Sequence, residues 1–117
     1  MKPHQNFESL PLWEPLMAFV RDIYELTNYF PESEKAGMTR KLRDKATDIP
    51  MALAAALNGG PASGISEAIA ATAQTETLLI ICKNLNLVTE EATDDFQTVI
   101  QQLKAQLNSL NSRLQKQ

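Results

Sequence analysis

The sequence predicts an all-α protein in which four helices pack as an antiparallel up-down-up-down bundle. Apolar residues recur at steps of three and four along most of the chain, which is a helical period. Runs that alternate apolar and polar residues between turns, the pattern of a half-buried strand, are nearly absent. Short connections between stretches of similar length favour antiparallel neighbours. The predicted helices cover about residues 12–29, 33–57, 64–85 and 90–115.

A length of 117 residues suits one hydrophobic core, so we expect a single domain over residues 1–117. The hydrophobic fraction of 44% and the charged fraction of 21% are typical of soluble globular proteins. The N-terminal residues lack the basic and apolar pattern of a signal peptide, and the strongly apolar run from Leu78 to Cys82 is too short to span a bilayer. We therefore expect a cytoplasmic protein that does not bind membranes.

The first two predicted helices are bounded by prolines and a candidate cap. Pro15 lies in a first turn, where a missing N–H is tolerated, and Pro31 ends the first helix. Ser33 is the expected cap of the second helix, with Glu34 in its first turn. Because the apolar period continues on both sides of Pro50, this proline is expected to kink the second helix rather than end it.

The third predicted helix is rich in alanine and then apolar nearly all round, which suggests burial on more than one side and hints at a partner subunit. The alanines of the second and third helices allow close approach, either inside the bundle or between subunits. The fourth helix begins after the capping residue Thr89. Its apolar residues form a heptad seam: Phe96, Ile100, Leu103, Leu107, Leu110 and Leu114.

Positive charge is concentrated in one segment of a chain whose net charge is −3. Residues 35–45 carry five basic residues and one aspartate, a net charge of +4, whereas residues 1–34 sum to −4 and residues 46–117 to −3. One interpretation is a phosphate-binding surface. The alternative is a solvated helix face on which Asp44 pairs with Arg40 one turn away. The candidate nucleic-acid contacts are Arg40, Lys41, Arg43 and Lys45.

Glu76 is the one acidic residue expected to be partly buried, because it shares a helix face with Ile69 and Ile80. A buried carboxylate needs a partner, and Arg43 or Arg40 on the second helix is the candidate, with Arg43 preferred. No second carboxylate lies one turn away on that helix, so a structural ion pair is favoured over a catalytic acid.

Signals of catalysis are weak in this sequence. A single histidine, His4, excludes the paired Glu-x-x-His motifs of di-iron bundles and the usual zinc ligand sets. Cys82 has no plausible histidine base and is expected to be a small buried hydrophobic residue. We predict no enzymatic activity, no metal and no cofactor.

Several short motifs recur together over about residues 6–114. They are Phe7 with Leu10 and Trp13, Ile23 to Thr27 with Phe30 and Pro31, Glu34 with Gly37 and Met38, Arg40 to Lys45, Ile49 with Pro50, and Glu76 with Thr77 before Leu78 and Leu79. In these residues the chain resembles the four-helix bundle protein family of ribosomal RNA intervening sequences.

This resemblance implies a left-handed bundle that assembles as a homopentamer with a basic central surface. The accessory proteins of diversity-generating retroelements are similar in fold and bind a reverse transcriptase and nucleic acid. The resemblance thus predicts a non-catalytic adaptor whose partners are its own copies, RNA or DNA, and a reverse transcriptase or another protein. The alternative is a protein-interaction scaffold without nucleic-acid binding. After Pro50 the family's polar motif is replaced by Met51 to Ala56, so its Asn and Glu have no counterpart.

Overall fold

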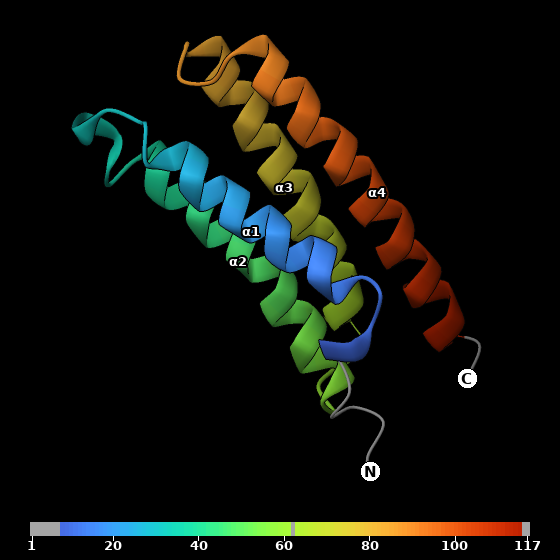
Figure 1. Cartoon of the computed structure of the whole chain (residues 1–117). Coiled ribbons are helices and arrows are strands. Elements are labelled where there is room, and N and C mark those ends of the chain that lie inside the picture. The colour runs from blue at the N-terminus through green and yellow to red at the C-terminus, as the bar shows by residue number, and fades with distance from the viewer. Residues whose placement is uncertain (1–7, 62, 116–117) are drawn as a thin grey trace.

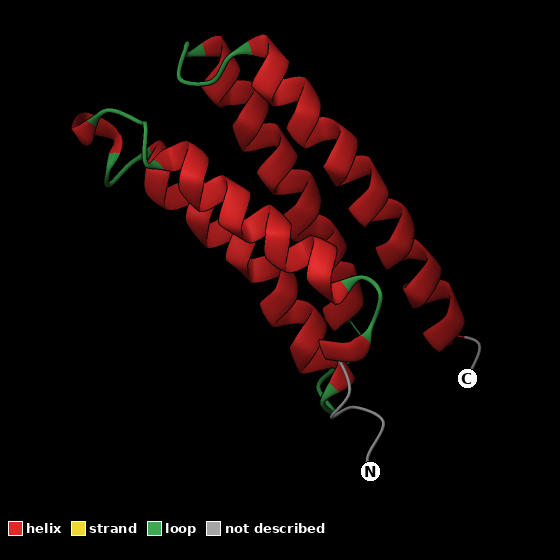
Figure 2. Ribbon diagram, viewed as in Figure 1, coloured by secondary structure: helices red, strands yellow, loops and turns green. Residues whose placement is uncertain are grey.

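Four long helices, each antiparallel to the one before it, make up the computed structural model (Figure 1), which describes residues 8–61 and 63–115. The predicted all-α class and the sequential antiparallel order are confirmed, and the described residues contain no strand (Figure 2). His4 and Phe7, named above, lie outside the described residues. The elements are α1 (Trp13–Thr27), the short 3-10 helix η2 (Glu32–Glu34), α2 (Met38–Leu57), α3 (Gly64–Asn84) and α4 (Glu90–Gln115).

The four helices are not packed equally tightly against one another. Contact is most extensive between α2 and α3, smaller for α3 with α4 and for α1 with α2, and smallest between α1 and α4. Across this loosest pair, the rings of Phe19 and Phe96 meet edge to face, with centroids 6.0 Å apart and an interplanar angle of 81°. In Figure 1, α1 lies along α2 and α3 lies along α4. Three neighbouring helix pairs are therefore well packed, whereas the fourth pair, α1 with α4, makes only limited contact.

The core consists of the apolar stripes that the helical period predicts. Each helix contributes side chains that are completely buried, and the middle of the heptad seam of α4 faces inward. Leu114, the last position of that seam, is 38% exposed. The largest fully buried side chains include Leu16, Phe19, Ile23, Leu42, Ile49, Leu53, Ile65, Leu79, Ile100, Leu103 and Leu107.

The predicted start of the second helix is wrong. Residues 32–34 form the separate turn η2, and α2 begins only at Met38, whose N–H donates to the carboxylate Oε1 of Glu34 at 3.1 Å. Ser33 therefore does not cap α2. Gly37 makes the arrangement possible, because a Cβ at this position would lie 2.8 Å from the same Oε1. The carboxylate thus satisfies one of the free N–H groups of the first turn.

Pro50 is buried inside α2, and the helix continues on both sides of it, as the apolar period predicts. The kink itself stays a prediction.

Close packing of α2 on α3 depends on small residues. A Cβ at Gly64 would lie 2.6 Å from the Cβ of Ala56 and 3.0 Å from the carbonyl oxygen of Ala52. At least part of the alanine-rich surface therefore serves contact within the bundle.

Helix α3 is long and apolar enough to cross a membrane by length and composition alone. In this structure it is a core helix of a helical globule, lying between α2 and α4 and burying Leu79 and Cys82 completely. Its apolar character nevertheless extends to the surface, where Ile81 is 36% exposed and Leu85, just after its end, is 53% exposed.

Candidate functional site

The basic segment is divided between two flanks of α2. Successive residues of a helix are rotated by about 100°, which places the exposed Asp44 between Arg40 and Lys41 on the outer face of α2. Arg40 and Arg43 lie on the flank next to α1, and Lys41 and Lys45 lie on the flank next to α3, as the residues around each pair show. The four candidate contacts are thus two pairs rather than one continuous patch.

On the first flank, an open surface hollow of about 600 Å³ lies between α1, η2 and the start of α2. We call it the α1–α2 hollow. Its lining includes three basic side chains and two carboxylates, which belong to Glu32 and Asp44. Its other charged or aromatic lining residues are Tyr24, Lys35, Arg40 and Arg43.

Arg43 fastens α2 to the end of α1. Its Nε donates to Oγ1 of Thr27 at 2.8 Å, and its Nη2 donates to Oδ1 of Asn28 at 3.0 Å and to the carbonyl oxygen of Tyr24 at 3.4 Å. The guanidinium also lies 4.5 Å from the centre of the Tyr24 ring. A cation is favourable at the C-terminus of a helix, where the helix dipole is negative. Arg43 is consequently held in place, with a structural role.

Arg40, in contrast, is exposed and makes no ion pair within the part of the chain that the structure describes. The expected pairing of Asp44 with Arg40 is therefore not formed. Lys35 lies 3.8 Å from Glu32 in an exposed pair, which water screens strongly. Arg40 is thus the cation of this hollow that is most available to a ligand.

On the second flank, Lys41 and Lys45 border a hollow of about 560 Å³ between α2 and α3, which we call the α2–α3 hollow. Lys45 lies 3.8 Å from Oδ2 of Asp48, whereas Lys41 is exposed and has no ion-pair partner among the described residues. The rest of the lining is uncharged apart from Asp44. It comprises Ala73, Gln74, Thr77 and Leu78.

Glu76 pairs with α4 and not with α2, so the predicted pair with Arg43 is wrong. Lys104 Nζ donates to Glu76 Oε1 at 2.6 Å, and Gln101 Nε2 donates to Oε2 at 3.2 Å. The two charged side chains are 18% and 27% exposed for Glu76 and Lys104. Arg43 points toward α1, on the other side of the molecule's second helix. The signal that was missed is Lys104 itself, a lone cation in the middle of the fourth helix.

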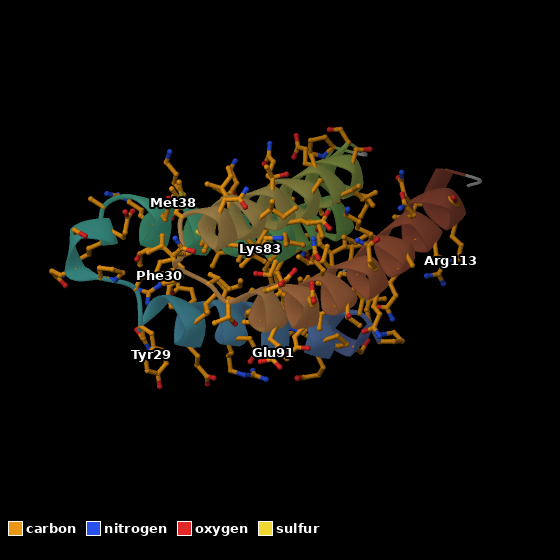
Figure 3. The ribbon with its side chains drawn as sticks, turned by 90° about the horizontal axis from the view of Figure 1, so that it is seen from above. Tyr29, Phe30, Met38, Lys83, Glu91 and Arg113 are labelled. Atoms are coloured by element: carbon orange, nitrogen blue, oxygen red, sulfur yellow. The ribbon has the colours of Figure 1, made fainter. Side chains whose placement is uncertain are left out.

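A second surface feature, which sequence reasoning did not single out, is an acidic groove of about 360 Å³ between α1 and α4. We call it the α1–α4 groove. Its rim carries Asp22, Glu25 and Asp95, and its apolar lining is Leu26, Phe96 and Val99. Tyr29 also borders the groove, with 90% of its surface exposed. In Figure 3 its side chain points away from the bundle.

Cys82 is fully buried, as predicted. Burial, and to a smaller extent the nearby Glu34 carboxylate, raises the pKa of the Cys82 thiol to about 11. The thiolate required of a nucleophile is therefore scarce near neutral pH. Among the described residues, no three side chains of histidine, cysteine, aspartate or glutamate are grouped so as to hold a metal ion.

Fold and surface together define a small all-α bundle protein that carries charged hollows on its outside. A family model for the 23S rRNA-intervening sequence protein matches residues 8–109, which is most of the chain. The chain belongs to this family, as its motifs suggested, and the family is not known to be enzymatic. No curated protein matches the chain.

Proposed function

We propose that this chain is a non-catalytic, homo-oligomeric adaptor that associates with nucleic acid through the α1–α2 hollow. The observation that carries the proposal is the juxtaposition of the unpaired Arg40 with the fixed pair of Arg43 and Tyr24. A cation beside an aromatic and guanidinium surface is the combination that binds single-stranded nucleic acid, by phosphate attraction and base stacking.

Charge in the hollow is smaller than the sequence suggests. Lys35, Arg40 and Arg43 against Glu32 and Asp44 leave a net charge of +1 per chain, compared with +4 for residues 35–45. One such hollow attracts a polyanion weakly. Five copies around a ring would give +5 on one assembly, so oligomerisation is part of this proposal and not an addition to it.

Titration of short single-stranded RNA and DNA at several salt concentrations tests the proposal. We expect binding that weakens steeply as salt rises. Substituting Arg40→Glu should lower the affinity and flatten its salt dependence, because a cation in the hollow becomes an anion. Arg21→Glu makes the same charge change at an exposed site of α1 outside the hollow and is the matched control. Absence of salt-sensitive binding at low ionic strength would refute the proposal.

The second candidate is a protein-interaction scaffold that binds no nucleic acid. It is favoured by the surface of α3 and of Leu85 just after it, where none of the exposed residues from 70 to 85 is charged and the charged side chains Glu76 and Lys83 are only partly exposed. The exposed residues there are Ala70, Ala73, Gln74, Thr77, Ile81, Asn84 and Leu85. Such an uncharged surface is typical of protein contacts. An oligomer that binds neither RNA nor DNA in the same titration would favour the function as a protein-interaction scaffold.

The likeness to the family supports more specific expectations about the assembly, the helices, the location and the partner of the protein. By this likeness we expect five subunits, a left-handed bundle, a kink at Pro50, a cytoplasmic location and, as one possible class of protein partner, a reverse transcriptase. Solution mass by light scattering tests the subunit number directly.

A further inference from the structure

We propose that the surface around the α1–α4 groove of one copy packs against the surface around the α2–α3 hollow of a second copy. Tyr29, at the edge of the groove, enters that hollow. This inference rests on the proposed homo-oligomer and names the surfaces that would join its subunits.

The two surfaces lie on opposite sides of the bundle, near the same end. Because the helices follow one another around the bundle, the pair α2 and α3 lies across from the pair α1 and α4. Figure 3 shows α2 and α3 on one side, near the labels of Met38 and Lys83, and Tyr29 with Glu91 on the other. Both surfaces belong to the end where α1 finishes and α4 begins.

Their rims carry opposite charge. Asp22, Glu25 and Asp95 give the groove three carboxylates, none of which is in an ion pair within the described part of the chain. The hollow carries Lys41 and Lys45 against Asp44, and Lys41 is likewise unpaired. Attraction between such rims speeds association and fixes the orientation of the partners.

Both surfaces also offer apolar area to bury. The groove is lined by Leu26, Phe96 and Val99, and the hollow by Ala73 and Leu78. Tyr29 lies at the edge of the groove, and the described residues leave 90% of its surface exposed. The hollow on the other copy, at about 560 Å³, has room for a phenol ring. Exposed tyrosines are favoured anchors of protein interfaces, because one flat side chain buries much area at small entropic cost.

Other occupants of the acidic groove are disfavoured by its charge. A two-fold pairing of the groove with itself would place three carboxylates against three carboxylates, and phosphate groups would meet the same repulsion. The groove calls for a cationic protein surface, and the chain carries one on its opposite side. Contact between two different surfaces leaves one of each unused on every dimer, so association continues into a closed ring or a filament.

This contact leaves the α1–α2 hollow free. Asp44 lines both hollows, but Arg40 lines only the α1–α2 hollow, and Lys41 and Lys45 line only the α2–α3 hollow. Assembly and nucleic-acid binding are therefore separable by mutation, even though both use the same helix.

Charge reversal tests the contact. The variants are Asp22→Lys with Glu25→Lys in the groove, Lys41→Glu with Lys45→Glu in the hollow, and a quadruple variant that combines all four and has the net charge of the unmodified protein. Solution mass is measured by light scattering, and folding is checked by circular dichroism. Each double variant should fall to the mass of a single chain at concentrations where the unmodified protein is assembled, and the quadruple variant should recover assembly.

Glu8→Lys with Glu14→Lys is the matched control, since it makes the same charge change as the groove variant at exposed residues outside both surfaces. We expect it to assemble normally. A single-chain mass for the unmodified protein would overturn both the homo-oligomer and this contact. An assembly that persists in both double variants would overturn the contact alone, and leave the homo-oligomer and the Arg40 titration unaffected.

Discussion

The guanidinium of Arg43 lies over the ring of Tyr24, 4.5 Å from its centre, and the same group reaches the last turn of α1 through Thr27 and Asn28. A residue taken from the sequence as a nucleic-acid contact is thereby the main polar link between α1 and α2. Its charge still faces the α1–α2 hollow, so a structural role and a binding role coincide in one side chain.

Replacing Arg43 should destabilise the protein. We expect Arg43→Ala to lower the free energy of unfolding by about 1–2 kcal/mol, since a partly buried hydrogen bond contributes about 1 kcal/mol and an exposed cation–π contact somewhat less. Urea denaturation measures the change. Arg43→Lys keeps the charge but not the fork of donors, so it should recover only part of the loss. Arg40→Ala, without such contacts, should leave stability within about 0.5 kcal/mol of the unmodified protein.

The Glu76 and Lys104 pair should show measurable but modest coupling. A double-mutant cycle between Glu76→Ala and Lys104→Ala is expected to give roughly 0.5–1 kcal/mol, because both side chains are partly exposed and water screens the charges. The coupling should shrink as salt is added. The same cycle between Glu76 and Arg43 should give none, and a coupling there as large as with Lys104 would contradict the observed geometry.

Packing between α2 and α3 should be sensitive to one methyl group. Gly64→Ala places a Cβ 2.6 Å from the Cβ of Ala56, and overpacking of this kind costs about 1–3 kcal/mol. The higher helix propensity of alanine offsets part of this cost. Thermal unfolding should therefore show a lower midpoint. Adding Ala56→Gly removes the closest clash, so the double variant should lose less stability than the two single changes predict together.

Cys82 should make stability depend on alkaline pH. Because its folded pKa of about 11 lies above its ordinary value of 9.0, the native state holds the proton more tightly than the unfolded state does between these values. Its contribution is fully present below about pH 9 and is lost as the pH rises toward 11, by at most about 3 kcal/mol. Comparing pH-dependent urea denaturation with Cys82→Ala isolates this contribution from other titrating groups. Identical pH dependence of the two proteins would show that the thiol has no such role.

Tyr29 should matter for assembly and not for folding. With 90% of its surface exposed, it contributes little to the core, so Tyr29→Ala should keep the unfolding midpoint of the dissociated chain. The same change should weaken self-association by about tenfold or more, if Tyr29 anchors the proposed contact. Light scattering over a dilution series measures this. Tyr24→Ala is an unsuitable control because Arg43 packs on that ring. Leu114→Ala changes another exposed large side chain, 38% exposed, at the end of α4 remote from the groove residues Asp95 and Val99.

The sequence predicts features that follow from the period of one helix, but not those that depend on how two helices are oriented against each other. Buried positions such as Leu42 and Ile100 follow from period alone, because a helix with one apolar stripe has a single way to hide it. The partner of Glu76 does not, because it depends on how α3 is rotated against α4. The start of α2 was mispredicted for another reason. A serine is the usual cap, but here Gly37 lets the carboxylate of Glu34 act from four residues back.

The basic segment illustrates the same limit at the surface. Net charge summed along a chain takes no account of helix rotation, and six residues of helix turn Arg40 and Lys45 toward different neighbours. The acidic groove was missed because its carboxylates come from α1 and α4, which are remote in the sequence. Only the folded arrangement places them together.

Weak contact between α1 and α4 also bears on how the chain is made. The extensive contacts all join helices that are neighbours in the sequence, so few contacts require segments far apart in the chain to come together. Chains with such local contacts fold quickly. During synthesis, α1 and α2 can pair, and α3 can add to them, before α4 has left the ribosome. The last helix then completes a bundle that is already largely assembled.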